Sequence, residues 1–199
     1  MRVIAGKYKR TPIQTLEGDD ITRPTKDMVK EALFSSIEIY SDTIFLDLFS
    51  GTGAIGIEAL SRGAEDVVFN DINKQAYGII KQNLKKVNED RKVFNLDYQE
   101  CLNKLEGYKF DYIYCDPPYN FKAYEEIFFY VNKLSLLNKK GIMIMEVRKD
   151  TDLNETYLNM HLYKEKRYGI NKLYYYRLEN NWWLKQFILE HLILLLKVI

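Results

Sequence analysis

The sequence of 199 residues has few of the features that build metal centres, disulfide frameworks or membrane spans. Its only two cysteines, Cys101 and Cys115, show no CxxC spacing and have no histidine near them in sequence. Neither a zinc site nor a disulfide framework is therefore expected, which fits a reducing compartment. The N-terminus lacks the apolar run of a signal peptide, and no stretch before residue 184 is apolar and long enough to cross a membrane. We therefore expect a cytoplasmic protein.

The chain also lacks a large net charge, which is +1, but its basic residues are unevenly distributed. The first sixteen residues contain no acidic residue and four basic ones, Arg2, Lys7, Lys9 and Arg10. Residues 161–178 contain one acidic residue, Glu165, and five basic ones, Lys164, Lys166, Arg167, Lys172 and Arg177. Two such segments indicate either one localised anion-binding face or two solvated edges.

Short apolar runs alternate with amphipathic stretches between about residues 43 and 147. We expect strands at 44–49, 67–69, 92–96, 110–115 and 142–147, and helices at 54–62, 74–87 and 124–136, with an earlier helix beginning near residue 25. Strands joined by helical crossovers predict a parallel sheet with helices on both faces. Two more strands, at 160–167 and 172–178, predict an antiparallel hairpin.

The predicted fold is thus an α/β, Rossmann-like domain over residues 23–180, with a mostly parallel seven-stranded sheet and a C-terminal antiparallel hairpin. An irregular basic arm, residues 1–22, precedes it. A hydrophobic tail, residues 181–199, follows and is expected to be helical. Three alternatives remain for the tail: packing on the domain or on a second copy, an added segment without a role, or membrane contact.

A glycine-rich segment follows the first predicted strand and opens a helix. Gly51 and Gly53 begin a G-x-G-x-x-G pattern, in which glycines let the backbone approach a nucleotide, and Asp71 lies twenty residues after Gly51. These features alone fit NAD and S-adenosylmethionine almost equally. Asp47, four residues before Gly51, would repel a pyrophosphate but can engage the amino-acid part of S-adenosylmethionine. Asp97, after the third strand, can accept from the adenine amino group, or it can cap a helix.

The tetrapeptide Asp116-Pro117-Pro118-Tyr119 ends the fourth predicted strand, at the sheet edge where open α/β folds bind ligands. Two prolines fix the backbone and remove two donors, which leaves the Asp116 carboxylate and the Pro117 carbonyl as acceptors. Two acceptors can hold an aromatic exocyclic amine so that its lone pair points at a sulfonium methyl group. Transfer then depends on alignment and needs no metal. Tyr119 is expected to stack on a flipped base. The alternative is a turn without a chemical role.

The chain resembles the bacterial 16S ribosomal RNA guanine-N2 methyltransferase family, on three segments that span residues 22–34, 47–53 and 116–119. The opening residues 2–6 and the turn at 168–169 are similar too. The resemblance implies that Asp47, Gly51, Gly53, Asp71 and Asp97 bind S-adenosylmethionine and that residues 116–119 hold guanine. It also implies 16S ribosomal RNA, within the assembled small subunit, as the partner. Asp71 is a departure, since the family often has glutamate there. Arg2, Lys7, Lys9, Arg10 and Arg23 are the candidate RNA-binding residues.

Three other functions remain open at this stage. A DNA adenine methyltransferase shares the glycine and Asp-Pro-Pro-Tyr motifs, but it normally carries an added recognition segment for which this chain has little room. An NAD(P)-dependent oxidoreductase leaves Asp116 to Tyr119 unexplained. The third alternative is an RNA-binding module that has the fold of a methyltransferase but no catalytic activity.

Overall fold

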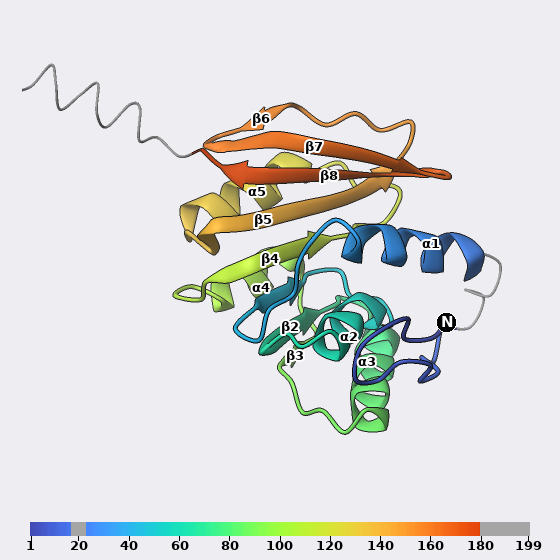
Figure 1. The fold of residues 1–199 in the computed structure, drawn as a ribbon. Helices are drawn as coiled ribbons and strands as arrows, with labels where there is room; N and C mark the ends of the chain where they lie inside the picture. Colours follow the sequence, from blue (N-terminus) through green and yellow to red (C-terminus); the bar gives the residue numbers. More distant parts are fainter. Residues whose placement is uncertain (17–22, 180–199) are drawn as a thin grey trace, which may run out of the picture.

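The computed structural model describes residues 1–16 and 23–179, so the predicted tail lies outside the described residues. The described strands form one eight-stranded sheet in the order β3-β2-β1-β4-β5-β8-β7-β6 (Figure 1). The strands are β1 (Ile44–Asp47), β2 (Asp66–Asn70), β3 (Val93–Phe94), β4 (Phe110–Cys115), β5 (Leu137–Arg148), β6 (Thr156–Tyr157), β7 (Met160–Tyr168) and β8 (Asn171–Leu178). β3, β2, β1, β4 and β5 pair in parallel. β8, β7 and β6 complete the sheet by antiparallel pairing.

The predicted fold class is confirmed, with one strand more than expected. The additional strand, β6, has only two residues, which is too short to produce an alternating pattern in the sequence. β5 begins five residues earlier than predicted, because Leu137 already pairs with Phe110 of β4. Only two residues of the third predicted strand pair with β2. No helix in residues 1–16 and 23–179 is long and apolar enough to cross a membrane.

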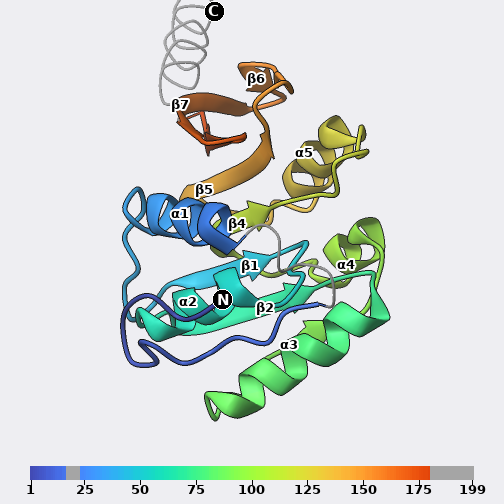
Figure 2. The same ribbon diagram turned by 90° about the vertical axis from the view of Figure 1, so that its right-hand side faces the viewer.

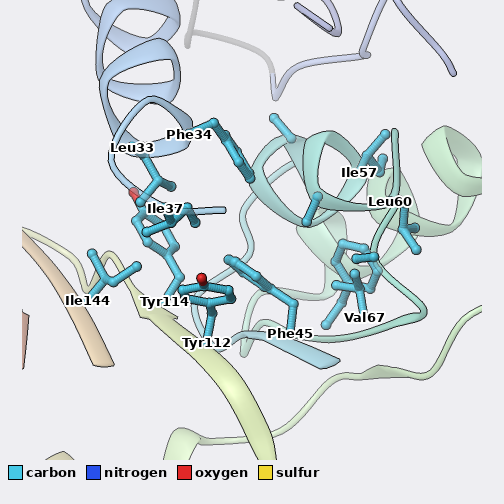
Figure 3. Packing of buried hydrophobic residues seen from close by; sticks show 14 of the residues in the cluster. Leu33, Phe34, Ile37, Phe45, Ile57, Leu60, Val67, Tyr112, Tyr114 and Ile144 are labelled. Carbon is cyan, nitrogen blue, oxygen red and sulfur yellow. The ribbon is translucent and has the colours of Figure 1, made fainter. Parts of the chain in front are cut away.

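Helices cover both faces of the sheet (Figure 2). They are α1 (Arg23–Phe34), α2 (Ala54–Ser61), α3 (Lys74–Lys86), α4 (Tyr98–Lys104) and α5 (Tyr124–Lys133). The first three share one hydrophobic cluster and the last two share the other. Because successive strand residues point to opposite faces, Tyr112 and Tyr114 of β4 belong to the first cluster, and Ile113 to the second. Figure 3 shows Leu33 and Phe34 of α1 on the tyrosine side of β4.

The N-terminal arm is irregular, as expected, but its first sixteen residues are anchored on the domain. Val3 and Ile13 are buried in the α1–α3 cluster. The amides of Ile4 and Ala5 donate to the buried Glu58 carboxylate of α2, at 2.8 and 3.0 Å. Gly6 has φ +79°, and a Cβ there would lie 1.8 Å from the Ser61 carbonyl oxygen. The arm thus passes α2 so closely that only glycine fits at position 6.

Candidate functional site

A cavity of about 370 Å³ opens at the carboxyl ends of β1, β4 and β5. Its wall contains all four predicted catalytic residues, Asp116 to Tyr119, together with Asp47 and Gly51 of the predicted cofactor set. Gly53, Asp71 and Asp97 are not part of this wall. Open α/β sheets bind ligands at this edge, where the strand order reverses around β1 and β4.

The glycine loop between β1 and α2 adopts a conformation that requires glycine. Gly51 and Gly53 have φ values of +54° and +76°, in the left-handed region, and Gly53 is the N-cap of α2. A Cβ at Gly56 would lie 2.2 Å from the Phe69 ring of β2, so α2 packs closely on the sheet. The tight turn and the close packing of the helix on the sheet are the roles that glycines have in a nucleotide-binding loop. At Gly51 the backbone of the loop lines the cavity.

Asp47 is the last residue of β1 and is 1% exposed. The Gly56 amide donates to its Oδ2 at 3.0 Å, whereas its buried Oδ1 has no hydrogen-bond partner among the described residues. Burial raises the pKa of Asp47 to about 7, with a further contribution from the charge of Asp71. A buried acceptor without a partner is costly, so the cavity wall at Asp47 fits a ligand that carries a donor or a positive charge.

Asp71 and Asp97 follow β2 and β3, and both hold backbone amides. Asp71 accepts from the Gly51 amide at 2.7 Å and from the Asn73 amide at 2.8 Å. Asp71 therefore fixes the glycine loop at the point where that loop lines the cavity. Asp97 is the N-cap of α4 and accepts from the Gln99 amide at 2.8 Å. The capping alternative for Asp97 is thus observed, and its role toward a cofactor stays a prediction.

Residues 116–119 leave β4 and turn back at the cavity edge. The Phe121 amide donates to the Pro118 carbonyl at 2.8 Å and closes this turn. Tyr119 is 71% exposed, and the Arg148 guanidinium lies 5.5 Å from the centre of its ring. The turn presents the Asp116 side chain and an accessible aromatic ring to the same cavity.

Tyr114, Glu146 and Asn171 are among the cavity residues that the sequence did not single out, and they form one hydrogen-bonded group. The buried Glu146 carboxylate of β5 accepts from the Tyr114 hydroxyl and from Nδ2 of Asn171. Oδ1 of Asn171 is buried and has no hydrogen-bond partner among the described residues. The signal available in the sequence was the single charged residue, Glu146, inside the apolar run of β5. Asn171 carried no signal, because the pairing of β8 with β5 brings it to the cavity.

The predicted RNA-binding residues of the arm are on the surface. Arg2, Lys7, Lys9 and Arg10 are exposed, and Lys7 lies 3.9 Å from Glu89. Arg23 is the first residue of α1, and its side chain is outside the described part of the structure. The arm packs on α2, on the sheet face that carries α1 to α3.

The chain is similar in sequence and in fold to several known proteins. The family model of conserved hypothetical protein 95 matches residues 1–177. Ribosomal RNA small subunit methyltransferase D of Haemophilus influenzae is 33% identical over 91% of this chain and 94% of its own length. The structure of a hypothetical protein from Thermus thermophilus superposes with a TM-score of 0.76, at 23% identity, over 89% of this chain and 99% of that one. A structure complexed with SAH has the same fold at 15% identity, with a TM-score of 0.63 over 77% of this chain and 49% of that one.

The fold and the relatives together place this chain in the class of Rossmann-like methyltransferases that use S-adenosylmethionine. The chain belongs to the conserved hypothetical protein 95 family, which its match over residues 1–177 establishes. The Haemophilus influenzae relative, at 33% identity, confirms the family resemblance found in the sequence. An NAD(P)-dependent oxidoreductase, one of the alternatives left open by the glycine pattern, is set aside.

Proposed function

We propose that this protein transfers a methyl group from S-adenosylmethionine to the exocyclic N2 amine of a guanine in 16S ribosomal RNA, within the small ribosomal subunit. One observation supports this above the others. The unpartnered, buried Oδ1 of Asp47 and the Asp116–Tyr119 turn line a single cavity. The name of the Haemophilus influenzae relative, a small-subunit ribosomal RNA methyltransferase, supports the same substrate.

The cofactor is held by Asp47, Gly51 and Gly53, with Asp71 and Asp97. Bound S-adenosylmethionine supplies a methyl group on a positively charged sulfur. Oδ1 of Asp47 accepts from the cofactor's amino group and gains the partner that it lacks among the described residues. Asp71 acts on the glycine loop through the Gly51 amide, at 2.7 Å, so that the loop is rigid where it meets the ligand.

The target amine is held by Asp116 and Pro117. Their side-chain carboxylate and main-chain carbonyl each accept an N–H bond, which directs the nitrogen lone pair along the line of methyl transfer. The Asp116 carboxylate is also placed to take the proton that the amine loses as the C–N bond forms. Tyr119, with its exposed ring, stacks on a base turned out of its helix.

The acceptors around the cavity favour guanine over adenine. Guanine presents N1–H and two N2–H donors on its Watson–Crick edge, whereas adenine has an acceptor at N1. The cavity wall offers the carboxylates of Asp116 and Glu146 and the buried, unpartnered Oδ1 of Asn171. A base with adjacent donors can give Oδ1 of Asn171 the partner that it lacks among the described residues, whereas the N1 acceptor of adenine would face these oxygens without a hydrogen to donate.

The arm contacts the RNA backbone through Arg2, Lys7, Lys9 and Arg10, and Arg23 does so at the start of α1. Basic side chains at phosphates position RNA without reading its sequence. Specificity for one nucleotide then comes from the cavity and from the shape of the assembled particle.

Labelled S-adenosylmethionine and three acceptors test the proposal: small ribosomal subunits, naked small-subunit RNA and duplex DNA. Nuclease digestion and mass spectrometry identify the methylated nucleoside. We expect N2-methylguanosine, with the highest yield from the subunits. Methyladenine in the DNA, or label in none of the three acceptors, would contradict the proposed substrate.

A further inference from the structure

A strip of basic and aromatic side chains crosses the outer hairpin, on the sheet face that carries α1. We call it the hairpin strip, and it consists of Tyr163, Lys164, Lys166 and Arg177. A β-bulge gathers these residues, because the pairing of β7 with β8 shifts between Leu162 and Lys164. The bulge leaves Tyr163 unpaired and turns Lys164 to the same face as its partner, Tyr175.

Ring contacts fix the members of the hairpin strip on this face. The Arg177 guanidinium lies 3.9 Å from the centre of the Tyr163 ring, and Nζ of Lys164 lies 5.1 Å from that of Tyr175. The rings of Tyr163 and Tyr175 meet edge to face, with centroids 6.3 Å apart. Tyr175 belongs to the α1–α3 cluster, which identifies the face. Lys166 pairs with Leu173 of the same cluster.

The charges of the hairpin strip are not neutralised by ion pairs within the described part of the chain. Of the five basic residues between 161 and 178, Arg167 lies 2.8 Å from Glu165 and Lys172 lies 2.5 Å from Asp152. Glu165 pairs with Tyr174, whose ring belongs to the α5 side of the sheet. The remaining three, Lys164, Lys166 and Arg177, have no ion pair with any carboxylate of residues 1–16 and 23–179.

Like charges act on one another along the hairpin strip. Partial burial lowers the pKa of Lys164, and the charges of Lys166 and Arg177 lower it further. Beyond Arg177, at the end far from the cavity, Glu179 lies 3.3 Å from the His161 ring. Three neighbouring cations that have no counter-charge among the described residues are costly for a free protein and favourable for one that binds an anion.

The hairpin strip begins beside the candidate active site. Leu173 of β8 pairs with Lys166 on one side and with Glu146, in the cavity wall, on the other. Lys166 is therefore two strands, about 10 Å, from Glu146, and Lys164 is about 7 Å further along β7. The turn between β7 and β8 contributes Ile170 and Asn171 to the cavity itself.

We propose that the hairpin strip binds the phosphate backbone of the substrate RNA next to the flipped nucleotide. The strip is a second RNA-contact surface, separate from the N-terminal arm, and it rests on RNA being the substrate. Lys164, Lys166 and Arg177 contact phosphates, and Tyr163 offers a half-exposed ring to an unpaired base. The cavity wall contains three carboxylates, of Asp47, Asp116 and Glu146, and one cation, Lys30, so exposed cations beside it help to hold a nucleic acid while one base enters.

The salt dependence of RNA binding tests the hairpin strip. The triple variant Lys164→Gln/Lys166→Gln/Arg177→Gln and the wild-type protein are titrated with a small-subunit ribosomal RNA fragment between about 50 and about 200 mM salt. We expect the slope of log Kd against log salt to fall by about 2 in the variant. Lys164→Arg/Lys166→Arg keeps the wild-type slope, because it keeps the charge.

A matched variant removes charge elsewhere. Lys81→Gln/Lys85→Gln/Lys86→Gln also removes three charges, from α3, which covers the opposite edge of the sheet, and it should leave the slope unchanged. Unaltered cofactor affinity in the triple variant shows that it is folded. Two results would overturn the proposal. In one, the triple variant has the same salt slope as the wild-type protein; in the other, the hairpin-strip variant and the α3 variant lose the same amount of RNA affinity. If the hairpin strip contributes to RNA binding but the protein transfers no methyl group to RNA, the proposed function is wrong and the RNA-binding role of the strip is supported.

Discussion

Among single residues, Asp47 combines burial, an unfilled hydrogen-bond position and contact with the cavity. Its position four residues before Gly51 was sufficient to predict a cofactor role from the sequence. The raised pKa of Asp47 could not be predicted from the sequence, because it depends on how completely the rest of the fold shields this carboxylate from water. Without a ligand, an ionised carboxylate at this depth is unfavourable.

The pKa of Asp47 makes the stability of the unliganded protein depend on pH. Its folded-state pKa is raised from 3.8 to about 7, so the folded protein binds a proton that the unfolded chain releases between these values. The stabilising contribution is complete below about pH 4 and is lost as the pH rises to about 7, by up to about 1.4 kcal/mol per pH unit. Asp47→Asn should remove this part of the fall in unfolding free energy between about pH 5 and pH 7, measured by urea denaturation.

The exposed carboxylate of Asp42 serves as a control, because Asp42→Asn should keep the wild-type pH dependence. Asp47→Asn should also weaken S-adenosylmethionine binding by about tenfold or more, which corresponds to a hydrogen bond to a charged group. A wild-type pH profile in Asp47→Asn would mean that this carboxylate is ionised throughout and that the cavity does not desolvate it.

Glu146 and Asn171 illustrate where prediction from the sequence ends at the residue scale. A charged residue within a buried strand is unusual, and it could have been singled out in β5. Asn171 is the first residue of β8, after a turn of ordinary composition. Only the antiparallel pairing of β8 with β5 brings it to Glu146, so its place in the cavity is a property of the tertiary structure.

At the scale of elements, long periodic segments were predicted well and short ones were missed. The helices α2 and α3 and the strands β1, β2 and β4 lie within a few residues of their predicted ranges. The helix α4 and the strand β6 were not predicted, since seven and two residues give too little periodicity. The β-bulge at Tyr163 could not be predicted from the sequence either, although it determines on which face of the sheet Lys164 lies.

The α2 helix links the arm to the domain through one buried carboxylate. Glu58 accepts from the Ile4 and Ala5 amides, lies 3.7 Å from Nζ of the buried Lys30, and lies 2.9 Å from Nε of Arg62. Burial lowers the pKa of Lys30, and the charge of Glu58 opposes this change. The negative charge of Glu58 is therefore the main partner of a buried cation.

Removal of this carboxylate should destabilise the protein and release the arm. We expect Glu58→Ala to lower the free energy of unfolding by about 3–5 kcal/mol, because among the described residues it leaves the buried Lys30 charge with Asp27 alone, at 3.8 Å, as a counter-charge. Hydrogen exchange at the Ile4 and Ala5 amides should rise with it. Arg62→Ala, at a partly exposed partner, should cost about 1 kcal/mol or less. Equal effects of the two substitutions would argue against Glu58 as the anchor.

At the scale of the whole molecule, the basic N-terminal arm and the three cations of the hairpin strip lie on one side of the sheet. The arm packs on α2 and the hairpin strip lies beside α1, both on the face of the α1–α3 cluster. The sequence suggested one anion-binding face or two solvated edges. The structure also divides the second segment, since Arg167 and Lys172 are ion-paired on the other side.

Neutralising the basic residues of the N-terminal arm tests whether the arm contributes to RNA binding. Lys7→Gln/Lys9→Gln/Arg10→Gln should weaken RNA binding and reduce its salt slope by about 2, because three exposed cations are lost from the phosphate contacts. Affinity for S-adenosylmethionine, measured by calorimetry, should not change. If the triple variant of the arm has the wild-type salt slope, the arm does not contact the RNA backbone.

The most direct test of the central claim is single-turnover methyl transfer by Asp116→Asn. The substitution keeps the shape of the side chain at the cavity edge and removes the charged acceptor and the proton-accepting group. We predict wild-type affinity for S-adenosylmethionine and a loss of about 100-fold or more in the rate of transfer to small-subunit RNA. A variant that binds the cofactor normally and transfers methyl at the wild-type rate would contradict the claim that Asp116 holds the target amine.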